Sequence, residues 1–328
     1  MSLISTAPSP VFQDNLPQMD RFKMVSGTAH PDLAHEIACQ LDVPLASAYV
    51  GRFPDGEIDI KVHDDMRGAD VFLIQPTCPP VNEYILETVL LLDTLRRASA
   101  GRITVVMPYF GYARKDRKDE GRVPISAKVV ANMLVASGAN RVLTIDLHAQ
   151  QIQGFFDIPV DHLWARPVLQ EVVRDMKMDN LTICAPDVGA VKLARAWAKN
   201  LDCGLAIVDK RRTSGDKVVM ENVIGDVDGC DILLTDDMIS TAGTIAEASR
   251  ILKDKGAKRV FIAATHAVLC GPARERLAHA PVEQILVTNT VPLRGDLPDN
   301  LTQVSIAPLL SRAIQRIHKE ESVSALFD

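Results

Sequence analysis

After about Arg21 the chain alternates short runs of β-branched and aliphatic residues with longer stretches whose apolar positions recur at helical spacing. The apolar runs are short and continuous, as in parallel strands that are buried on both faces. They include residues 102–108, 141–146, 181–186, 204–209, 231–236, 259–264 and 284–288. The clearest helical stretches are residues 82–98, 126–136, 191–199 and 245–255. The alternation predicts an α/β fold of βαβ units with a mainly parallel sheet flanked by helices.

A chain of 328 residues is longer than one typical domain, which predicts two domains. The alternation is interrupted near residues 157–167, where the string IPVDHLWARP stands. We therefore expect one α/β domain over residues 21–160 and a second over residues 161–328. Residues 1–20 lack the basic and continuously apolar regions of a secretory signal. They contain several Pro and Ser residues and are expected to form a mobile extension.

The charge balance narrows the class of partner. Lys and Arg number 36 against 42 Asp and Glu, which gives a net charge of -6. This balance gives no electrostatic reason to expect nucleic-acid or membrane binding, and no apolar run approaches the roughly 20 residues that span a bilayer. The six cysteines contain no C-x-x-C pair. Reduced thiols in a cytoplasmic protein are therefore favoured over disulfides or a zinc site.

Several predicted strands end in a charged residue just before a turn. The residues concerned are Asp146, Asp187, Lys210 and Asp236. Open α/β sheets bind ligands at the carboxyl ends of their strands. These positions are therefore the first candidates for a functional site.

The most informative segment follows the run at residues 231–236. It carries Asp236 and Asp237, and then a turn made of Ser240, Thr241, Ala242, Gly243 and Thr244 that opens a helix. The amides of such a turn and the positive helix end can cradle a phosphate. The two carboxylates would repel phosphate but can accept protons from vicinal ribose hydroxyls. A pentose 5-phosphate site is the prediction, and a simple helix cap is the alternative.

This loop resembles the phosphoribosyl-diphosphate loop of type I phosphoribosyltransferases and of ribose-phosphate diphosphokinases. Other motifs resemble only the diphosphokinases, from about Met24 to Phe327. They are FPDGE at 53–57, YFGYAR at 109–114, PISAK at 124–128, DLHAQQIQGFFDIPVD at 146–161, KRR at 210–212 and ESVSALF at 321–327. The resemblance implies two tandem phosphoribosyltransferase-like domains. It also implies transfer of the diphosphoryl group of ATP to ribose 5-phosphate, with Mg²⁺, for nucleotide biosynthesis.

On the nucleotide side, the resemblance implies that Arg114, Lys115, Asp116 and His148 contact ATP. Taken alone, such a charge run is usually a solvated surface. The family commonly has Gln where Lys115 stands, which puts the usual amide contact in doubt.

A second ATP motif lies nearer the N-terminus. Its residues Phe53, Asp55, Gly56 and Glu57 match a loop that holds adenine from a neighbouring subunit. On its own, the string PDG indicates only a turn.

Metal ligands are expected at the end of the run at residues 141–146. Asp146 and His148 lie two apart and so share one face, and Mg²⁺ can take such ligands together with water and phosphate. A lone histidine is more often a packed core residue. The resemblance assigns His148 and Asp187 to the metal, with Asp146, Asp157 and Asp161 as further candidates. Asp161 can equally be read as a helix cap.

For catalysis, the resemblance assigns Lys210 and Arg212 to a flexible loop, where they would neutralise charge during diphosphoryl transfer. The chain departs from the family at Ser240, where an acid is frequent, and at Ala190, where the second glycine of a P-D-x-G-G motif is expected. Neither change removes a proposed cation or metal ligand, so an active enzyme is expected.

The C-terminal string resembles part of a regulatory site for ADP or phosphate. The positions that match this site are Arg67, Ser322, Ser324 and Phe327. Taken alone, the string is a chain end with an apolar anchor. The family also implies a homohexamer built from dimers. A phosphoribosyltransferase, a non-catalytic regulatory subunit and a nucleotide sensor remain alternatives.

Overall fold

The computed structural model describes residues 22–212 and 219–327, and for residues 210–212 and 219–221 it describes the backbone alone. Within these ranges the N-terminal half forms a five-stranded sheet whose neighbouring strands are all parallel. Its order is β1 (Phe22–Ser26), β4 (Asp70–Ile74), β5 (Arg102–Met107), β6 (Arg141–Ile145) and β7 (Val160–Leu163). A separate antiparallel hairpin consists of β2 (Ala48–Arg52) and β3 (Ile58–Val62).

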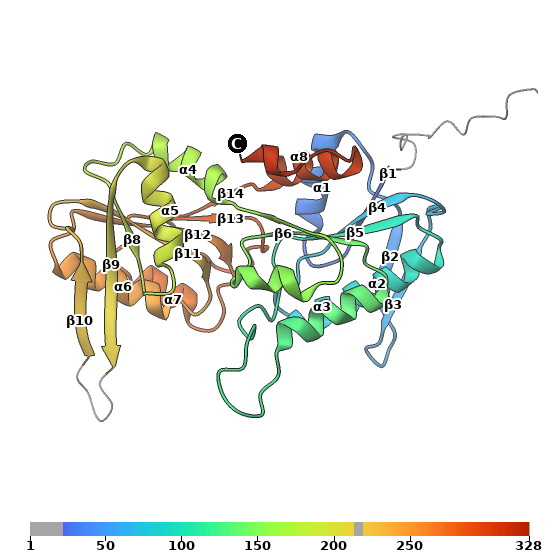
Figure 1. The fold of residues 1–328 in the computed structure, drawn as a ribbon, viewed down its shortest axis with the longest axis horizontal. Helices are drawn as coiled ribbons and strands as arrows, with labels where there is room; N and C mark the ends of the chain where they lie inside the picture. Colours follow the sequence, from blue (N-terminus) through green and yellow to red (C-terminus); the bar gives the residue numbers. More distant parts are fainter. Residues whose placement is uncertain (1–21, 213–218, 328) are drawn as a thin grey trace, which may run out of the picture.

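Helices cover both faces of this first sheet (Figure 1). One face packs against α2 (Val81–Arg97) and α3 (Ser126–Ser137), and the other against α1 (Pro31–Leu41) and α8 (Ala307–His318). Strand β4 is buried along its whole length, with Phe72 facing α1 and α8 and its neighbours facing α2. Burial on both faces explains why the strands are continuous apolar runs in the sequence.

The C-terminal half holds a second, seven-stranded sheet among the described residues. Its order is β10 (Val219–Ile224), β9 (Gly204–Arg212), β8 (Thr182–Ala185), β11 (Asp231–Ile239), β12 (Arg259–Ala267), β13 (Gln284–Thr288) and β14 (Leu301–Val304). Only the β9–β10 pair is antiparallel. One face packs against α4 (Arg166–Asp175) and α5 (Val191–Leu201), and the other against α6 (Gly243–Asp254) and α7 (Ala273–Ala278). Short 3₁₀ helices η2 (Gln150–Phe155) and η3 (Ser324–Leu326) complete the described elements.

The order of the second sheet identifies where a ligand can bind. Strand β8 leads through α5 to β9 on one side, whereas its neighbour β11 leads through α6 to β12 on the other side. Helices α5 and α6 lie on opposite faces (Figure 1). Adjacent strands with diverging connections leave a crevice at their carboxyl ends. In this sheet that crevice lies between the ends of β8 and β11.

The structure confirms the predicted α/β alternation and lengthens several of the strands. β9 continues to Arg212 because it pairs with β10, and the two strands extend beyond the sheet (Figure 1). β11 continues to Ile239 because it pairs with β12 up to the Ile239–Ala267 position. Asp236 and Asp237 therefore lie within the strand, not after it.

The division predicted between residues 160 and 161 stays a prediction. One strand spans this position, and one helix of the second half packs on the first sheet. β7 pairs with β6 through residues 160–163 and belongs to the first sheet. Helix α8 returns from the second half and packs beside α1 (Figure 1). Nδ1 of His318 at its end lies 2.7 Å from Oδ2 of Asp70, at the start of β4. The described helices include none that is long and apolar enough to cross a membrane.

Candidate active site

The turn between β11 and α6 contains one left-handed residue, and two of its backbone carbonyls accept hydrogen bonds from other segments of the chain. Ala242 adopts a left-handed conformation with φ 57° immediately before α6. The amide of Cys270 donates to the carbonyl of Ser240 at 2.9 Å, and Nη1 of Arg276 donates to the carbonyl of Thr241 at 3.0 Å. Ala242 occupies the N-cap position of α6 and makes no side-chain cap hydrogen bond. The simple helix-cap alternative is therefore wrong, and the positive helix end faces the crevice, where it suits an anion.

The side chains of this turn differ in their surroundings. Oγ of Ser240 lies 3.2 Å from Sγ of Cys270, so this hydroxyl already has a neighbour on the protein. Thr241 and Thr244 are exposed at the surface. A Cβ atom added at Gly243 would lie 3.1 Å from Nη1 of Arg276, which is tight contact. The absence of a side chain at Gly243 therefore lets Arg276 approach the turn.

The acidic residues of β11 meet a histidine from the other sheet. Nδ1 of His148, in the turn after β6, lies 2.7 Å from Oδ2 of Asp237. The amide of Asp237 donates to Oδ1 of Asp236 at 2.9 Å. The side chains of His148 and Asp237 are 41% and 21% exposed, so a ligand can reach the pair. The structure thus joins two motifs that lie 89 residues apart in the sequence.

The two carboxyl groups differ in charge state. Burial raises the pKa of Asp236 to about 8, and the charges of Asp237 and Asp187 act in the same direction. Burial acts to raise the pKa of Asp237 as well, but the hydrogen bond and charge of His148 outweigh it and lower this pKa. The hydrogen bond to Asp237 in turn raises the pKa of His148. At pH 7 the site therefore offers a protonated carboxyl that can donate a hydrogen bond beside a carboxylate that accepts.

Asp187 lies on the other side of the crevice, just after β8. It is exposed, and its Oδ1 accepts from the amide of Ala190 at 3.1 Å. Ala190 itself is buried in the packing of α5, so its methyl group faces the core. The extra methyl group relative to the family glycine is thus accommodated inside the protein.

A metal at this crevice would have to be shared with a ligand. Among the described residues, no group of three or more His, Cys, Asp or Glu side chains is arranged to hold a metal ion. Mg²⁺, however, commonly takes one or two carboxylates and completes its shell with water and substrate phosphates. The exposed carboxylate of Asp187 fits that requirement, whereas the half-exposed ring of His148 offers a nitrogen and not the oxygen that Mg²⁺ prefers.

The other three aspartates predicted near the metal are placed differently. Asp146 is buried, and its Oδ2 accepts from the amide of Ala165 at 3.0 Å and from Oγ1 of Thr265 at 2.6 Å. Burial raises its pKa to about 6. Oδ2 of Asp161 lies 2.6 Å from Nη1 of Arg141, at the opposite edge of the first sheet. Asp161 lies inside β7 and does not cap a helix.

Asp157 is 85% exposed and pairs loosely with Lys128 at 3.8 Å. Neither Asp157 nor Asp161 has a described contact with the group around Asp237.

The predicted ATP loop after β5 lies at the edge of the crevice. Nη2 of Arg114 donates to Sδ of Met238 at 3.3 Å, which places this guanidinium beside the acidic pair of β11. Nζ of Lys115 instead pairs with Asp119 at 2.9 Å. Asp116 accepts a hydrogen bond from Gln151 of η2. Of the three predicted residues, Arg114 is thus the one in contact with β11.

The predicted adenine loop is not brought to this group within one chain. Phe53, Asp55, Gly56 and Glu57 form the tip of the β2–β3 hairpin, which lies on the far side of the first sheet from β11 (Figure 1). The tip is a compact turn, in which the amide of Glu57 donates to Oδ1 of Asp55 at 3.1 Å and Gly56 has φ 93°. The Phe53 ring is 49% exposed. The exposed part of this residue is available for contact with another molecule.

The predicted catalytic cations lie at the edge of what the structure describes. The backbones of Lys210 and Arg212 form the end of β9, paired with Glu221 and Val219 of β10. Their side chains lie outside the described part. Strand β9 neighbours β8, so its end extends beyond the same edge of the sheet as Asp187.

The predicted regulatory residues are spread over two regions. Arg67 is exposed in the turn before β4. The carbonyl of Ser322 accepts from Nε of Arg316, and Ser324 begins η3. The ring of Phe327 packs edge-on against Trp164, with centroids 5.3 Å apart. The apolar anchor predicted for the chain end is thus Phe327 on Trp164.

Sequence reasoning missed several residues that shape the site. Tyr109 and Met238 share an apolar cluster between the two sheets. His266 of β12 is buried and its Nε2 lies 3.1 Å from the carbonyl of Asp146. Arg276 holds the carbonyl of Thr241. The polar residues inside the otherwise apolar string VFIAATHAV were the available signal for the β12 contacts.

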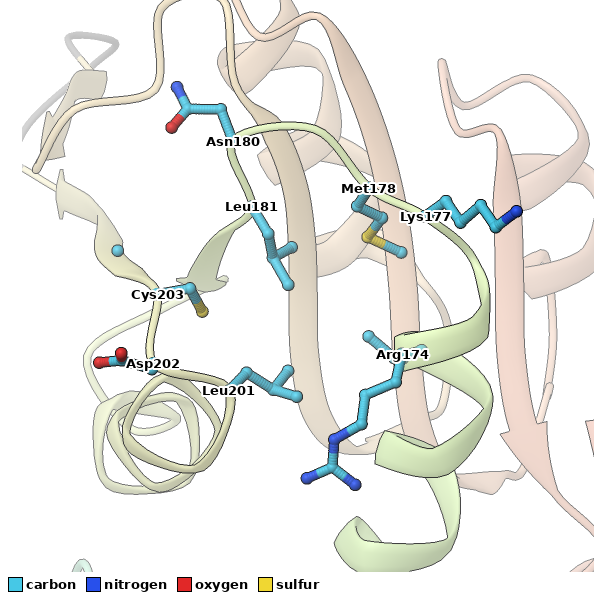
Figure 2. A pocket seen from close by; sticks show the side chains of 10 residues that line it. Arg174, Lys177, Met178, Asn180, Leu181, Leu201, Asp202 and Cys203 are labelled. Carbon is cyan, nitrogen blue, oxygen red and sulfur yellow. The ribbon is translucent and has the colours of Figure 1, made fainter.

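A large cavity lies away from these residues, in the second half of the chain. It has a volume of about 710 Å³ and opens at the amino ends of β8 and β9, between the ends of α4 and α5. Arg174 and Lys177 border it, with Leu181 and Leu201 on its walls (Figure 2). The acidic pair and the turn before α6 lie at the opposite edge of this sheet, so the cavity does not belong to the group described above.

Comparisons with known proteins agree with this arrangement. Residues 22–138 match the N-terminal domain of ribose phosphate pyrophosphokinase, and residues 212–328 match the phosphoribosyl synthetase-associated domain. The ribose-phosphate pyrophosphokinase of Rhodopirellula baltica is 53% identical over 313 residues, which cover 94% of this chain and 99% of that protein. The corresponding protein of Neisseria meningitidis serogroup A is 48% identical, over 94% of this chain and 95% of its own length.

A solved structure confirms the predicted fold class. Phosphoribosylpyrophosphate synthetase from Mycobacterium smegmatis is 41% identical and superposes with a TM-score of 0.87, over 92% of this chain and 99% of that chain. Identity at this level over nearly the whole length also confirms the resemblance seen in the motifs. The chain belongs to the ribose-phosphate pyrophosphokinase family.

Proposed function

We propose that this chain transfers the diphosphoryl group of ATP to the anomeric hydroxyl of ribose 5-phosphate, giving 5-phosphoribosyl 1-diphosphate and AMP for nucleotide biosynthesis. The observation that carries the proposal is the contact between His148 and Asp237. It brings the motif expected to hold ATP to within hydrogen-bonding distance of the strand expected to hold the sugar.

The sugar would bind across the end of β11. Its 5-phosphate would lie at the turn from Ser240 to Thr244, where Ala242 and Gly243 let the backbone approach and the end of α6 favours an anion. Its ring hydroxyls would face Asp236 and Asp237. A protonated Asp236 can donate to one hydroxyl oxygen while Asp237 accepts from another, so the pair suits a vicinal diol. Ser240 replaces the acid that is frequent in the family and supplies a hydroxyl there.

ATP would bind on the first-sheet side of the crevice. Arg114, beside Met238, would pair with phosphate oxygens, and the charges of Arg114 and Asp116 both act on His148. Lys115 would offer a cation in place of an amide. The adenine ring would be held by Phe53, Asp55, Gly56 and Glu57 of a neighbouring subunit, since the hairpin that carries them projects away from the crevice of its own chain.

Asp187 and His148 would hold Mg²⁺ together with the phosphates of ATP. When bound, the ion would neutralise charge on those phosphates. The protein's own contribution is to align the anomeric oxygen with the β-phosphorus and to exclude water. Lys210 and Arg212, at the end of β9, would close over the diphosphate and stabilise the charge that develops as AMP leaves.

We also propose a homohexamer built from dimers, located in the cytoplasm and regulated by ADP or phosphate. Six free cysteines support a reducing compartment. The regulatory ligand would contact Arg67, Ser322, Ser324 and the region around Phe327. No nucleic-acid or membrane partner is proposed.

The test of the proposed reaction is product analysis. Purified protein is mixed with ATP, Mg²⁺ and ribose 5-phosphate, and nucleotides and sugar phosphates are separated by chromatography. AMP and 5-phosphoribosyl 1-diphosphate in equal amounts are expected. Formation of ADP would indicate transfer of a single phosphoryl group, and no turnover with both ligands bound would indicate a sensor or regulatory subunit. Either result would exclude the proposal.

A further inference from the structure

Asp146 is fixed in place by hydrogen bonds of both its backbone and its side chain. It directly follows β6 and has a left-handed conformation with φ 39°, which is uncommon for a residue other than glycine and persists only where the surroundings enforce it. Its side chain is buried, with 9% exposed. Its amide donates to the carbonyl of Leu163 at 3.0 Å, so even its backbone is tied to β7.

The contacts of Asp146 reach both sheets. Oδ2 accepts from the amide of Ala165, just after β7, at 3.0 Å and from Oγ1 of Thr265 of β12 at 2.6 Å. Its carbonyl lies 3.1 Å from Nε2 of His266. Because a carbonyl only accepts, this imidazole nitrogen carries the proton. Two donors thus occupy Oδ2, and β12 of the second sheet holds both the side chain and the backbone of Asp146.

The residues that hold Asp146 are themselves fixed. Nδ1 of His266 lies 2.9 Å from Oγ1 of Thr290, and its ring packs edge-on against Tyr109. The carbonyl of Thr265 accepts from Oγ1 of Thr288 at 2.8 Å. All of these side chains are buried. A buried, mutually hydrogen-bonded network of this kind holds its members in one arrangement.

The turn that contains Asp146 also contains His148 of the candidate site. His148 stands two residues after Asp146 and meets Asp237, while the amide of Leu147 between them donates to Nε2 of His162 at 2.9 Å. β11 and β12 are adjacent, with Met238 opposite His266. Asp146 is thus hydrogen-bonded to β12, and His148 is hydrogen-bonded to β11. The turn after β6 therefore contacts two neighbouring strands of the second sheet.

We propose that Asp146 is a positioning residue and not a metal ligand: its buried carboxylate fixes the turn after β6 onto Thr265 and so sets His148 against Asp237. The proposal rests on the proposed role of His148 in the reaction. A metal ligand would need an accessible carboxylate with free lone pairs, whereas this one is buried with Oδ2 already accepting two hydrogen bonds.

Three variants separate the two roles. Thr265→Val removes the hydroxyl donor from the second sheet and leaves Asp146 intact. Asp146→Asn removes the charge but keeps an oxygen that can accept from Ala165 and Thr265. Thr144→Val is the matched control, because Thr144 is buried in β6 and its Oγ1 has no hydrogen-bond partner in the described structure.

Hydrogen–deuterium exchange in protein without metal or substrate reports on the turn directly. Thr265→Val is expected to speed exchange in peptides covering residues 145–149, while Thr144→Val leaves it unchanged. In steady-state assays Thr265→Val should lower kcat about 10-fold, because a displaced His148 would no longer help to align the reacting groups. Asp146→Asn should keep kcat within about 3-fold of the original, since its acceptor is retained.

Binding of Mn²⁺ in the presence of ATP, followed by electron paramagnetic resonance, completes the test. Unchanged affinity in Asp146→Asn, which keeps the acceptor for Thr265 and so keeps His148 in place, supports the positioning role. A loss of about 10-fold or more in Asp146→Asn would make the residue a ligand and overturn the proposal. Unaltered exchange and kcat in Thr265→Val would overturn it as well. Failure of the proposed function would show itself separately, as absence of AMP from the unmodified protein.

Discussion

Nδ1 of His148 lies 2.7 Å from Oδ2 of Asp237, and this hydrogen bond joins the turn after β6 of the first sheet to β11 of the second. A nucleotide held by the first sheet and a sugar held by the second would meet at this contact. The hydrogen bond also fixes which carboxyl group of β11 is ionised, because it favours the carboxylate of Asp237 while burial keeps Asp236 protonated.

Replacing His148 by Gln keeps an amide donor but removes the charge and the metal-binding nitrogen. We expect kcat to fall about 100-fold, the size of effect seen when one preorganised stabilising group is lost. AMP release measured under saturating substrates checks this. A kcat within a factor of three of the unmodified enzyme would remove His148 from the reaction.

The pair formed by His148 and Asp237 makes the free energy of unfolding depend on pH. The pKa of His148 is raised above 6.5, so its contribution is complete below that value and is lost as the pH rises through the raised pKa. The pKa of Asp237 is lowered below 3.8, so its contribution is present above 3.8 and is lost as the pH falls through the lowered pKa. The unfolding free energy lost in His148→Gln should be largest between pH 3.8 and 6.5. Urea unfolding in EDTA measures it, and a loss that grows above pH 8 would contradict the pairing.

Asp236→Asn should change stability while keeping a hydrogen-bond donor for the sugar. Burial raises the pKa of Asp236 from 3.8 to about 8, so the folded state retains a proton that the unfolded state releases, and stability falls as the pH rises between these values. Asn removes this penalty, so the variant should gain stability relative to the unmodified protein at pH 7 but not at pH 3.5. Ribose 5-phosphate affinity at pH 7 should stay within about 3-fold of the original, because the Asn amide can donate where the protonated carboxyl does. Calorimetry at the two pH values and a binding titration test both parts.

Arg276 is predicted to support the phosphate turn. In Arg276→Gln the donor to the carbonyl of Thr241 is lost or displaced, and the KM for ribose 5-phosphate should rise about 10-fold while the KM for ATP stays unchanged. Arg250→Gln, on the exposed side of α6, is the matched control. Equal KM values in the two variants would show that the turn holds its shape without Arg276.

Lys210→Ala should bind ATP normally and lose turnover by about 100- to 1,000-fold, since a cation that stabilises developing charge acts mainly in the transition state. Equilibrium dialysis with ATP and a rate measurement separate the two effects. Unchanged turnover would refute the role assigned to the end of β9.

Phe53→Ala should raise the KM for ATP about 10-fold, the scale of one lost stacking contact with a base. Stability should change little, because the ring is 49% exposed within its own chain. Mixing Phe53→Ala and Lys210→Ala subunits tests whether adenine is held across a subunit boundary. Refolded mixtures at low ATP should be more active than either variant alone, whereas activity equal to the average would place Phe53 and Lys210 in the same site.

The sequence by itself determined the class of the fold and the place of the turn that is proposed to bind phosphate. Both follow from local patterns, namely apolar runs of strand length separated by helical repeats, and a strand followed by hydroxyl residues and glycine. The turn at residues 240–244 has a recognisable pattern in its own residues, so they could be named in advance, although Cys270 and Arg276 hold its carbonyls in the folded chain. The resemblance then extended this to the nucleotide motifs.

Only the tertiary structure decided which of the named residues meet. His148 and Asp146 are two residues apart, yet the first faces the crevice and the second is buried against Thr265, because β12 lies where β6 ends. Asp161 pairs with Arg141 at the opposite edge of the first sheet, which no local pattern distinguishes from a metal ligand. The ionisation of Asp236 and Asp237 likewise depends on burial and on a histidine 89 residues away from Asp237. Such differences arise from contacts between segments far apart in the chain, and a linear sequence contains their partners without specifying their distances.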